Sequence, residues 1–108
     1  MKKVVKFGGS SLASAEQFKK VGKIIRADAS RKFVVPSAPG KRFSGDTKVT
    51  DMLYSCYGAA IREKKFADQL QEIWGRYQEI IDGLGLDFSL DQDFEKIREN
   101  FGIRPCAL

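Results

Sequence analysis

The stretch that organises this chain reads Val4-Val5-Lys6-Phe7-Gly8-Gly9-Ser10-Ser11. Its first four residues, three of them apolar, predict a short and largely buried strand that ends at the double glycine. A helix is predicted behind the two hydroxyl residues. Glycines let backbone N–H groups approach an anion, a helix N-terminus adds unpaired donors, and Lys6 brings a positive charge. The stretch therefore predicts a phosphate-binding site.

The familiar phosphate-binding motifs do not fit this stretch. A Walker A loop places its lysine after the glycines, whereas Lys6 precedes Gly8-Gly9. The other Gly-Lys pair, Gly40-Lys41, has Val35 at the first glycine position and Arg42 at the hydroxyl position. The dinucleotide fingerprint G-x-G-x-x-G is not present at the turn either. A plain turn that needs small residues therefore remains open as an alternative.

Composition is that of an ordinary globular chain. Its 108 residues are enough for one compact domain, and 43% are hydrophobic while 31% are charged. No apolar run approaches the ~20 residues of a membrane span, and no signal-peptide pattern follows Met1, which predicts a cytoplasmic protein without a membrane segment. The net charge is +5, but the basic residues are scattered, so nucleic-acid binding is not favoured.

The chain contains no histidine and two distant cysteines, Cys56 and Cys106. Ser-His-Asp and Cys-His catalysis and His-based metal sites are therefore excluded within this polypeptide, and no metal-ligating residue is assigned. Neither a disulfide scaffold nor a zinc site is indicated, and Cys56 is expected to pack in a helix face. Phosphoryl transfer remains possible, because it depends on positioning, positive charge and Mg²⁺.

The first half of the chain predicts a strand–helix–strand unit. A helix is expected from about Ser14 to Asp28, begun by a capping box of Ser14 and Gln17, and a second strand at Phe33–Val35. Such a unit gives parallel strands joined by a right-handed crossover. Gly8-Gly9 and Ser37 would then lie at the same sheet edge, where open α/β sheets bind ligands.

The second half predicts helices. Residues 36–46 are rich in Pro, Gly and Ser and form either a substrate loop or a plain surface connection. Apolar residues then recur at helical spacing, and the aromatic residues of the segment from Phe66 onward are expected in the core, with base stacking as the alternative. Three helices are expected. The first begins at a cap formed by Asp46 or Thr47, and the second contains Phe66 and ends near Gly83 and Gly85. The third begins at a Ser89–Gln92 capping box and is closed by Gly102 and Pro105.

Three segments resemble the aspartate kinases of the amino acid kinase superfamily. Residues 6–13, KFGGSSLA, resemble the signature K-F-G-G-[ST]-S-[VL]-A. Residues 34–41 resemble the later V-V-x-S-A segment, and residues 49–53 resemble [VI]-T-[DN]-x-L. The resemblance covers about the first half of the chain. It implies the α/β fold of the amino acid kinases, a three-layer sandwich, of which this chain is the N-terminal portion: a parallel β-α-β unit followed by three helices.

The resemblance also implies truncation. Two strands cannot cover the apolar faces of four helices, and an isolated two-stranded sheet is marginal. Aspartate kinases are several times longer, with regulatory domains behind the catalytic domain. Residues 1–108 are therefore expected to be a single N-terminal fragment of a catalytic domain, inactive alone and part of a homo-oligomer at full length. The adenine site and the remaining aspartate ligands would lie beyond Leu108.

The implied reaction is phosphoryl transfer from Mg-ATP to the side-chain carboxylate of L-aspartate, for lysine, threonine and methionine synthesis. ATP is the co-substrate and Mg²⁺ the metal. By motif, Lys6 is the catalytic residue on the β- and γ-phosphates, and Ser37 and Thr50 contact aspartate, with Ala38 near it through its backbone. The loop between Ser37 and Thr50 is longer than in the simplest family pattern. The remaining phosphate-binding positions are Gly8, Gly9, Ser10 and Ser11.

Two other functions stay open. One is a different amino acid kinase, with glutamate, UMP or carbamate as acceptor. The other is a non-enzymatic binding module, in which the apolar helices of residues 47–82 dock on a partner.

Overall fold

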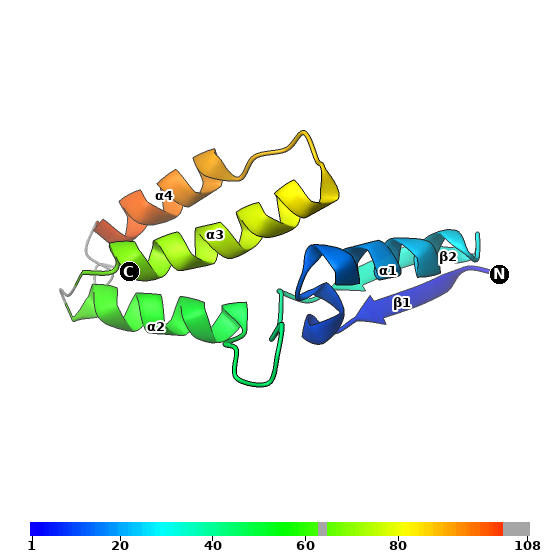
Figure 1. Cartoon of the computed structure of the whole chain (residues 1–108), viewed down its shortest axis with the longest axis horizontal. Helices are drawn as coiled ribbons and strands as arrows, with labels where there is room; N and C mark the ends of the chain where they lie inside the picture. Colours follow the sequence, from blue (N-terminus) through cyan, green and yellow to red (C-terminus); the bar gives the residue numbers. More distant parts are fainter. Residues whose placement is uncertain (63–64, 103–108) are drawn as a thin grey trace. The chain divides into compact units, whose positions relative to one another are not determined.

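The computed structural model describes residues 1–62 and 65–102 and divides into two compact units, Met1–Thr50 and the part from Asp51 onward. Each unit is described by itself. The element order confirms an α/β chain with one parallel strand pair and four α-helices in the described residues (Figure 1). The elements are β1 (Lys3–Phe7), the 3₁₀ helix η1 (Gly9–Leu12), α1 (Ala15–Arg26), β2 (Arg31–Pro36), α2 (Val49–Ile61), α3 (Ala67–Leu84) and α4 (Asp91–Gly102).

The first unit is a parallel strand pair with a helix packed on it. β1 and β2 pair with Lys6 opposite Val35 and Phe7 opposite Pro36, which confirms the predicted parallel pairing. The Ser37 N–H donates to the Phe7 carbonyl at 3.1 Å and extends the ladder past β2. A small apolar cluster joins β1, η1 and α1. Its buried members are Phe7, Leu12 and Val21, with Val5, Phe18 and Ile25 packed around them.

The prediction of a largely buried first strand is wrong for this structure. Only Phe7 is buried in β1, and Val4 is 69% exposed. Every residue of β2 from Lys32 to Pro36 is exposed, including Phe33 at 53% and Val35 at 47%. A parallel strand is buried when both faces of its sheet are covered. Here the first unit supplies one packed helix, so strand residues rich in apolar side chains face solvent.

The start of α1 follows the sequence prediction in part. Ser14 is the N-cap, and its Oγ accepts a hydrogen bond from the Gln17 N–H at 3.4 Å. The Gln17 side chain donates to the Ser10 carbonyl at 3.3 Å, so it does not complete a capping box on Ser14. The helix that directly follows Gly8 is η1, which begins at Gly9, and α1 begins only at Ala15.

The second unit consists of α2, α3 and α4 (Figure 1). Ile73 and Cys56 are almost fully buried, as expected for core positions. The Trp74 ring stacks on Phe94 with centroids 5.2 Å apart and planes 8° apart, and its Nε1 donates to the Asp91 carboxylate at 3.1 Å. Phe94 is buried, whereas Trp74 and Tyr77 of α3 are half-buried and pack against it, so the predicted core position of the α3 aromatic residues holds only in part.

Two helix starts differ from the predicted caps. α2 begins at Val49, so Lys48 precedes it and neither Asp46 nor Thr47 occupies the cap position. α4 begins at Asp91, whose N–H donates to the Ser89 hydroxyl at 3.1 Å. The predicted capping box at Ser89 is wrong in register, because a hydroxyl that reaches only two residues ahead makes a turn before the helix.

Pro105, which was predicted to close the last helix, and Cys106 lie outside the described residues. α4 ends at Gly102, as expected. Among the described helices, none is long and apolar enough to cross a membrane.

Two glycines of the second unit should respond to alanine with opposite signs. Gly85 caps α3 at φ 65°, and its N–H donates to the Asp82 carbonyl at 3.1 Å. Gly85→Ala should lower the free energy of unfolding by about 1 kcal/mol, because L-residues disfavour the left-handed region. Gly75 is exposed within α3, and a Cβ there would meet open space. Gly75→Ala should therefore raise the free energy of unfolding by about 0.5–1 kcal/mol. Urea unfolding followed by helical circular dichroism measures both, and equal signs would contradict the prediction.

Candidate functional site

The glycine turn follows directly from the end of β1. Gly8 is extended, with φ −75° and ψ 174°, and the Ser11 N–H donates to its carbonyl at 3.1 Å, which closes the 3₁₀ turn. A side chain at Gly8 would meet nothing within 4 Å, so the outer side of the turn is open. Lys6 is exposed, and its side chain forms no hydrogen bond or ion pair with any described residue. Its ammonium group is therefore available to an anion.

Ser37 and Ala38 lie at the corresponding end of β2. Ser37 is exposed and Ala38 half-buried. Because the strands are parallel and Phe7 pairs with Pro36, the glycine turn and Ser37 leave the sheet at the same edge. The structure thus brings the two sequence-predicted segments together, as the parallel topology predicts.

A close backbone contact joins these two segments. The Gly40 N–H donates to the Gly9 carbonyl at 2.8 Å. A Cβ built on Gly40 would lie 2.6 Å from the Gly9 carbonyl carbon and 2.9 Å from the Ser10 nitrogen. The segment is also anchored on its other side, where the Val49 N–H donates to the Pro39 carbonyl at 2.9 Å. Sequence reasoning gave Gly40 no role, although a glycine in a loop next to a predicted site was the available signal.

The rest of the loop is closed by an ion pair. Arg42 Nε and Nη2 donate to the two carboxylate oxygens of Asp46 at 2.7 Å and 3.1 Å, and the Arg42 backbone N–H donates at 3.0 Å. The Arg42 guanidinium holds the pKa of Asp46 well below its usual range, so the carboxylate stays charged and the pair persists in mildly acidic solution. Asp46 is therefore a loop-closing residue, which accounts for its absence from the cap of α2.

Thr50 lies in the first turn of α2 and is exposed. It follows Val49, the residue bonded to the Pro39 carbonyl. Thr50 therefore belongs to the same first unit as the glycine turn and Ser37, and it is tied to their loop through one neighbouring residue.

Metal ligands do not gather in the described part of the chain. No group of three or more His, Cys, Asp or Glu side chains there could hold a metal ion.

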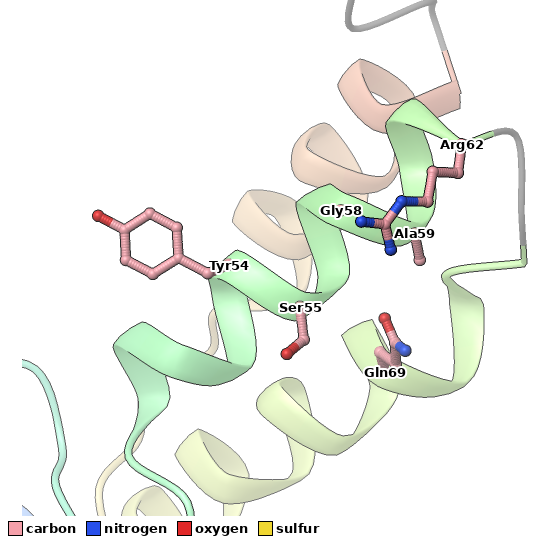
Figure 2. Close-up of a pocket in the computed structure, with 6 residues that line it drawn as sticks. All are labelled: Tyr54, Ser55, Gly58, Ala59, Arg62 and Gln69. Carbon is pink, nitrogen blue, oxygen red and sulfur yellow. The ribbon is translucent and has the colours of Figure 1, made fainter.

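A separate cavity lies between α2 and α3 in the second unit. It has a volume of about 500 Å³. Figure 2 shows Ser55 and Gln69 facing the space between the two helices, whereas Tyr54 points away from it. None of the sequence-predicted site residues lines this cavity. Its lining residues are Tyr54, Ser55, Gly58, Ala59, Arg62 and Gln69.

Comparisons with known proteins agree with the motif resemblance. No family model matches the chain. Over 98 residues, or 91% of its length, the chain is 45% identical to Aspartokinase 3 of Bacillus subtilis, and over 89 residues it is 36% identical to the Aspartokinase of Chlamydia pneumoniae. The crystal structure of Clostridium acetobutylicum aspartate kinase matches 91% of the chain with a TM-score of 0.86 and 47% identity.

The match covers only part of each relative. The chain spans 21% of the Bacillus protein, 18% of the Chlamydia protein and 23% of the Clostridium chain. The chain is therefore similar to a segment of these aspartate kinases that makes up about one fifth of their length.

Proposed function

We propose that this chain supplies part of the active site of an aspartate kinase, which transfers a phosphoryl group from Mg-ATP to the side-chain carboxylate of L-aspartate in amino-acid biosynthesis. The observation that carries the proposal is the meeting of two segments at one sheet edge. The turn with Lys6 and the segment from Ser37 lie there, joined by the backbone contact of Gly9 and Gly40. The chain that contains them is 45% identical to an aspartokinase.

The reaction suits the residues available. A carboxylate oxygen of aspartate attacks the γ-phosphorus, the new O–P bond forms as the bond to the β,γ-bridging oxygen breaks, and ADP leaves. The nucleophile is already ionised, so the step requires no histidine base. Its difficulty is to bring two anions together and to stabilise charge on the transferred group.

Lys6 serves as the charged group at the β- and γ-phosphates. It is exposed beside the turn and forms no ion pair within the described residues, which supports this role. Phosphate oxygens are bound at the open turn by the backbone and hydroxyl groups of Gly8, Gly9, Ser10 and Ser11.

Ser37 and Thr50 contact aspartate through their hydroxyl groups, and Ala38 lies beside it through its backbone. Mg²⁺ enters with the nucleotide as Mg-ATP, and we assign it to no side chain of the described residues. The adenine site and the other aspartate ligands are assigned outside residues 1–108. We accordingly propose that residues 1–108 are one N-terminal portion of a catalytic domain that works as a homo-oligomer at full length.

We expect the 108-residue chain alone to release no ADP in an aspartate-dependent manner, because it holds only part of the site. A chimera in which the chain replaces the matching segment of Bacillus subtilis Aspartokinase 3 should be active. A coupled ADP assay with aspartate, glutamate, UMP and carbamate as separate acceptors measures both proteins. Turnover by the isolated chain would refute the partial site. A folded but inactive chimera, or a preference for another acceptor, would refute the proposed function.

A further inference from the structure

We propose that Gly40 is a positioning residue for phosphate binding: its backbone sets the orientation of the Gly9–Ser10 peptide group. The inference rests on the proposed function and deepens it, because it assigns a role to a residue that touches no substrate. The role is carried by contacts between two backbone segments of the first unit.

The orientation follows from the planarity of the peptide bond. In a trans peptide the C=O of one residue and the N–H of the next point in opposite directions. None of the described peptide bonds is cis. When Gly40 holds the Gly9 carbonyl at 2.8 Å, it therefore fixes the direction of the Ser10 N–H as well, which points away from the loop.

The N–H groups in question are available to a ligand. In the described part of the chain, no acceptor is paired with the N–H groups of Gly9 and Ser10. Backbone N–H groups that are left unpaired in this way are the donors that phosphate oxygens require. A fixed Ser10 N–H is thus aimed before the nucleotide arrives, and the nucleotide need not reorient it.

Steric contact makes glycine necessary at position 40. An added Cβ would lie 2.6 Å from the Gly9 carbonyl carbon, 2.9 Å from its oxygen and 2.9 Å from the Ser10 nitrogen. Each of these atoms belongs to the same peptide group. Because all three are backbone atoms, no side-chain rotation can relieve the overlap. Alanine at position 40 must therefore rotate or displace the Gly9–Ser10 peptide.

The contact is rigid on the loop side too. Pro39 and Gly40 are both buried, and the Pro39 carbonyl accepts the Val49 N–H at 2.9 Å. A Cβ on Gly9 would lie 3.3 Å from the Ala38 carbonyl oxygen, so the two segments are closely packed along several residues. The same contact therefore holds the phosphate side and the aspartate side of the proposed site in a fixed relation. A displacement of about 1 Å between groups that position two reactants costs about 10²-fold in rate.

The first experiment compares the parent chimera with its Gly40→Ala and Gly45→Ala variants. Gly45 lies in the same loop, and its Cβ would meet only the Phe43 ring at 3.9 Å, which is ordinary contact. We expect Gly40→Ala to lower kcat/KM for ATP at least tenfold, through both KM and kcat, while Gly45→Ala stays within twofold. A purely structural role would reduce the amount of folded enzyme and leave the KM for ATP unchanged.

The outcomes separate the two proposals. An inactive parent chimera refutes the proposed function. An active parent with a folded Gly40→Ala variant of normal KM and kcat overturns the role of Gly40 alone.

A second measurement needs no variant and covers the case in which Gly40→Ala does not fold. Hydrogen exchange of the active parent chimera is followed by mass spectrometry on peptides that cover residues 7–12 and 37–41. We expect ATP to slow exchange in both segments, because the Gly40 N–H is bonded to the turn that holds the phosphates. Slower exchange in residues 7–12 alone, or in neither segment, would overturn the positioning role.

Discussion

Lys6→Ala is expected to lower the kcat of the active chimera by about 10²–10⁴-fold, because loss of one oxyanion-hole donor costs about 10²–10³-fold and a cationic side chain at a transferred phosphoryl group is worth about 10³–10⁵-fold. Lys6 points from β1 into solvent beside the glycine turn, without an ion-pair partner in the described residues. Its charge therefore contributes little to folding and is available to the transferred phosphoryl group. The variant should melt at the temperature of the parent. Steady-state kinetics with ATP and aspartate, together with a thermal melt, measure both quantities.

Lys32→Ala is the matched control for this substitution. Lys32 is also an exposed strand lysine, but it lies near the beginning of β2 and therefore toward the opposite end of the sheet. Its removal should change kcat less than twofold. Lys6→Arg should recover part of the lost rate, because it keeps the charge but not the compact ammonium. Near-normal turnover of Lys6→Ala, or an equal loss in Lys32→Ala, would contradict the phosphate role of Lys6.

The local elements of this fold were predictable because they depend on short-range patterns. Apolar spacing identified α1 and α3, and the left-handed Gly85 ends α3 where the glycines predicted. Parallel pairing followed from the length of the crossover between Phe7 and Arg31. Burial of the strands was mispredicted because apolar residues in a parallel strand indicate a sheet that is covered on both faces. In this chain Val4 and Phe33 belong to a pair covered on one face.

The candidate site was predictable in its segments and not in its details. The parallel strands alone place the glycine turn and Ser37 at one edge. The contact of Gly9 with Gly40 depends on backbone atoms of two separate loops, and no periodicity or spacing encodes such a meeting. The role of Asp46 was mispredicted for a related reason, because it depends on which neighbouring group the carboxylate contacts. Its carboxylate could cap α2 or pair with Arg42, and the two-oxygen pairing with the guanidinium prevails in the structure.

Phe94→Ala should unfold much of the second unit. Phe94 is 4% exposed, stacks on Trp74 at 5.2 Å and contacts the Tyr77 ring at 5.9 Å, so it joins α4 to α3. Removal of a buried phenylalanine costs about 3–5 kcal/mol, which is most of the stability of a small domain. Trp74 is the single tryptophan of the chain and reports this contact directly. Urea unfolding followed by its fluorescence should show a large loss of stability and a red-shifted starting spectrum.

Phe88→Ala provides the comparison, since Phe88 lies between α3 and α4 and is 58% exposed. It removes the same side chain from the neighbouring segment without opening a cavity, so its effect should stay within about 0.5 kcal/mol. Similar losses in both variants would mean that aromatic content in general stabilises the helices. A loss confined to Phe94→Ala would mean that the buried ring of Phe94, stacked on Trp74, holds α4 against α3.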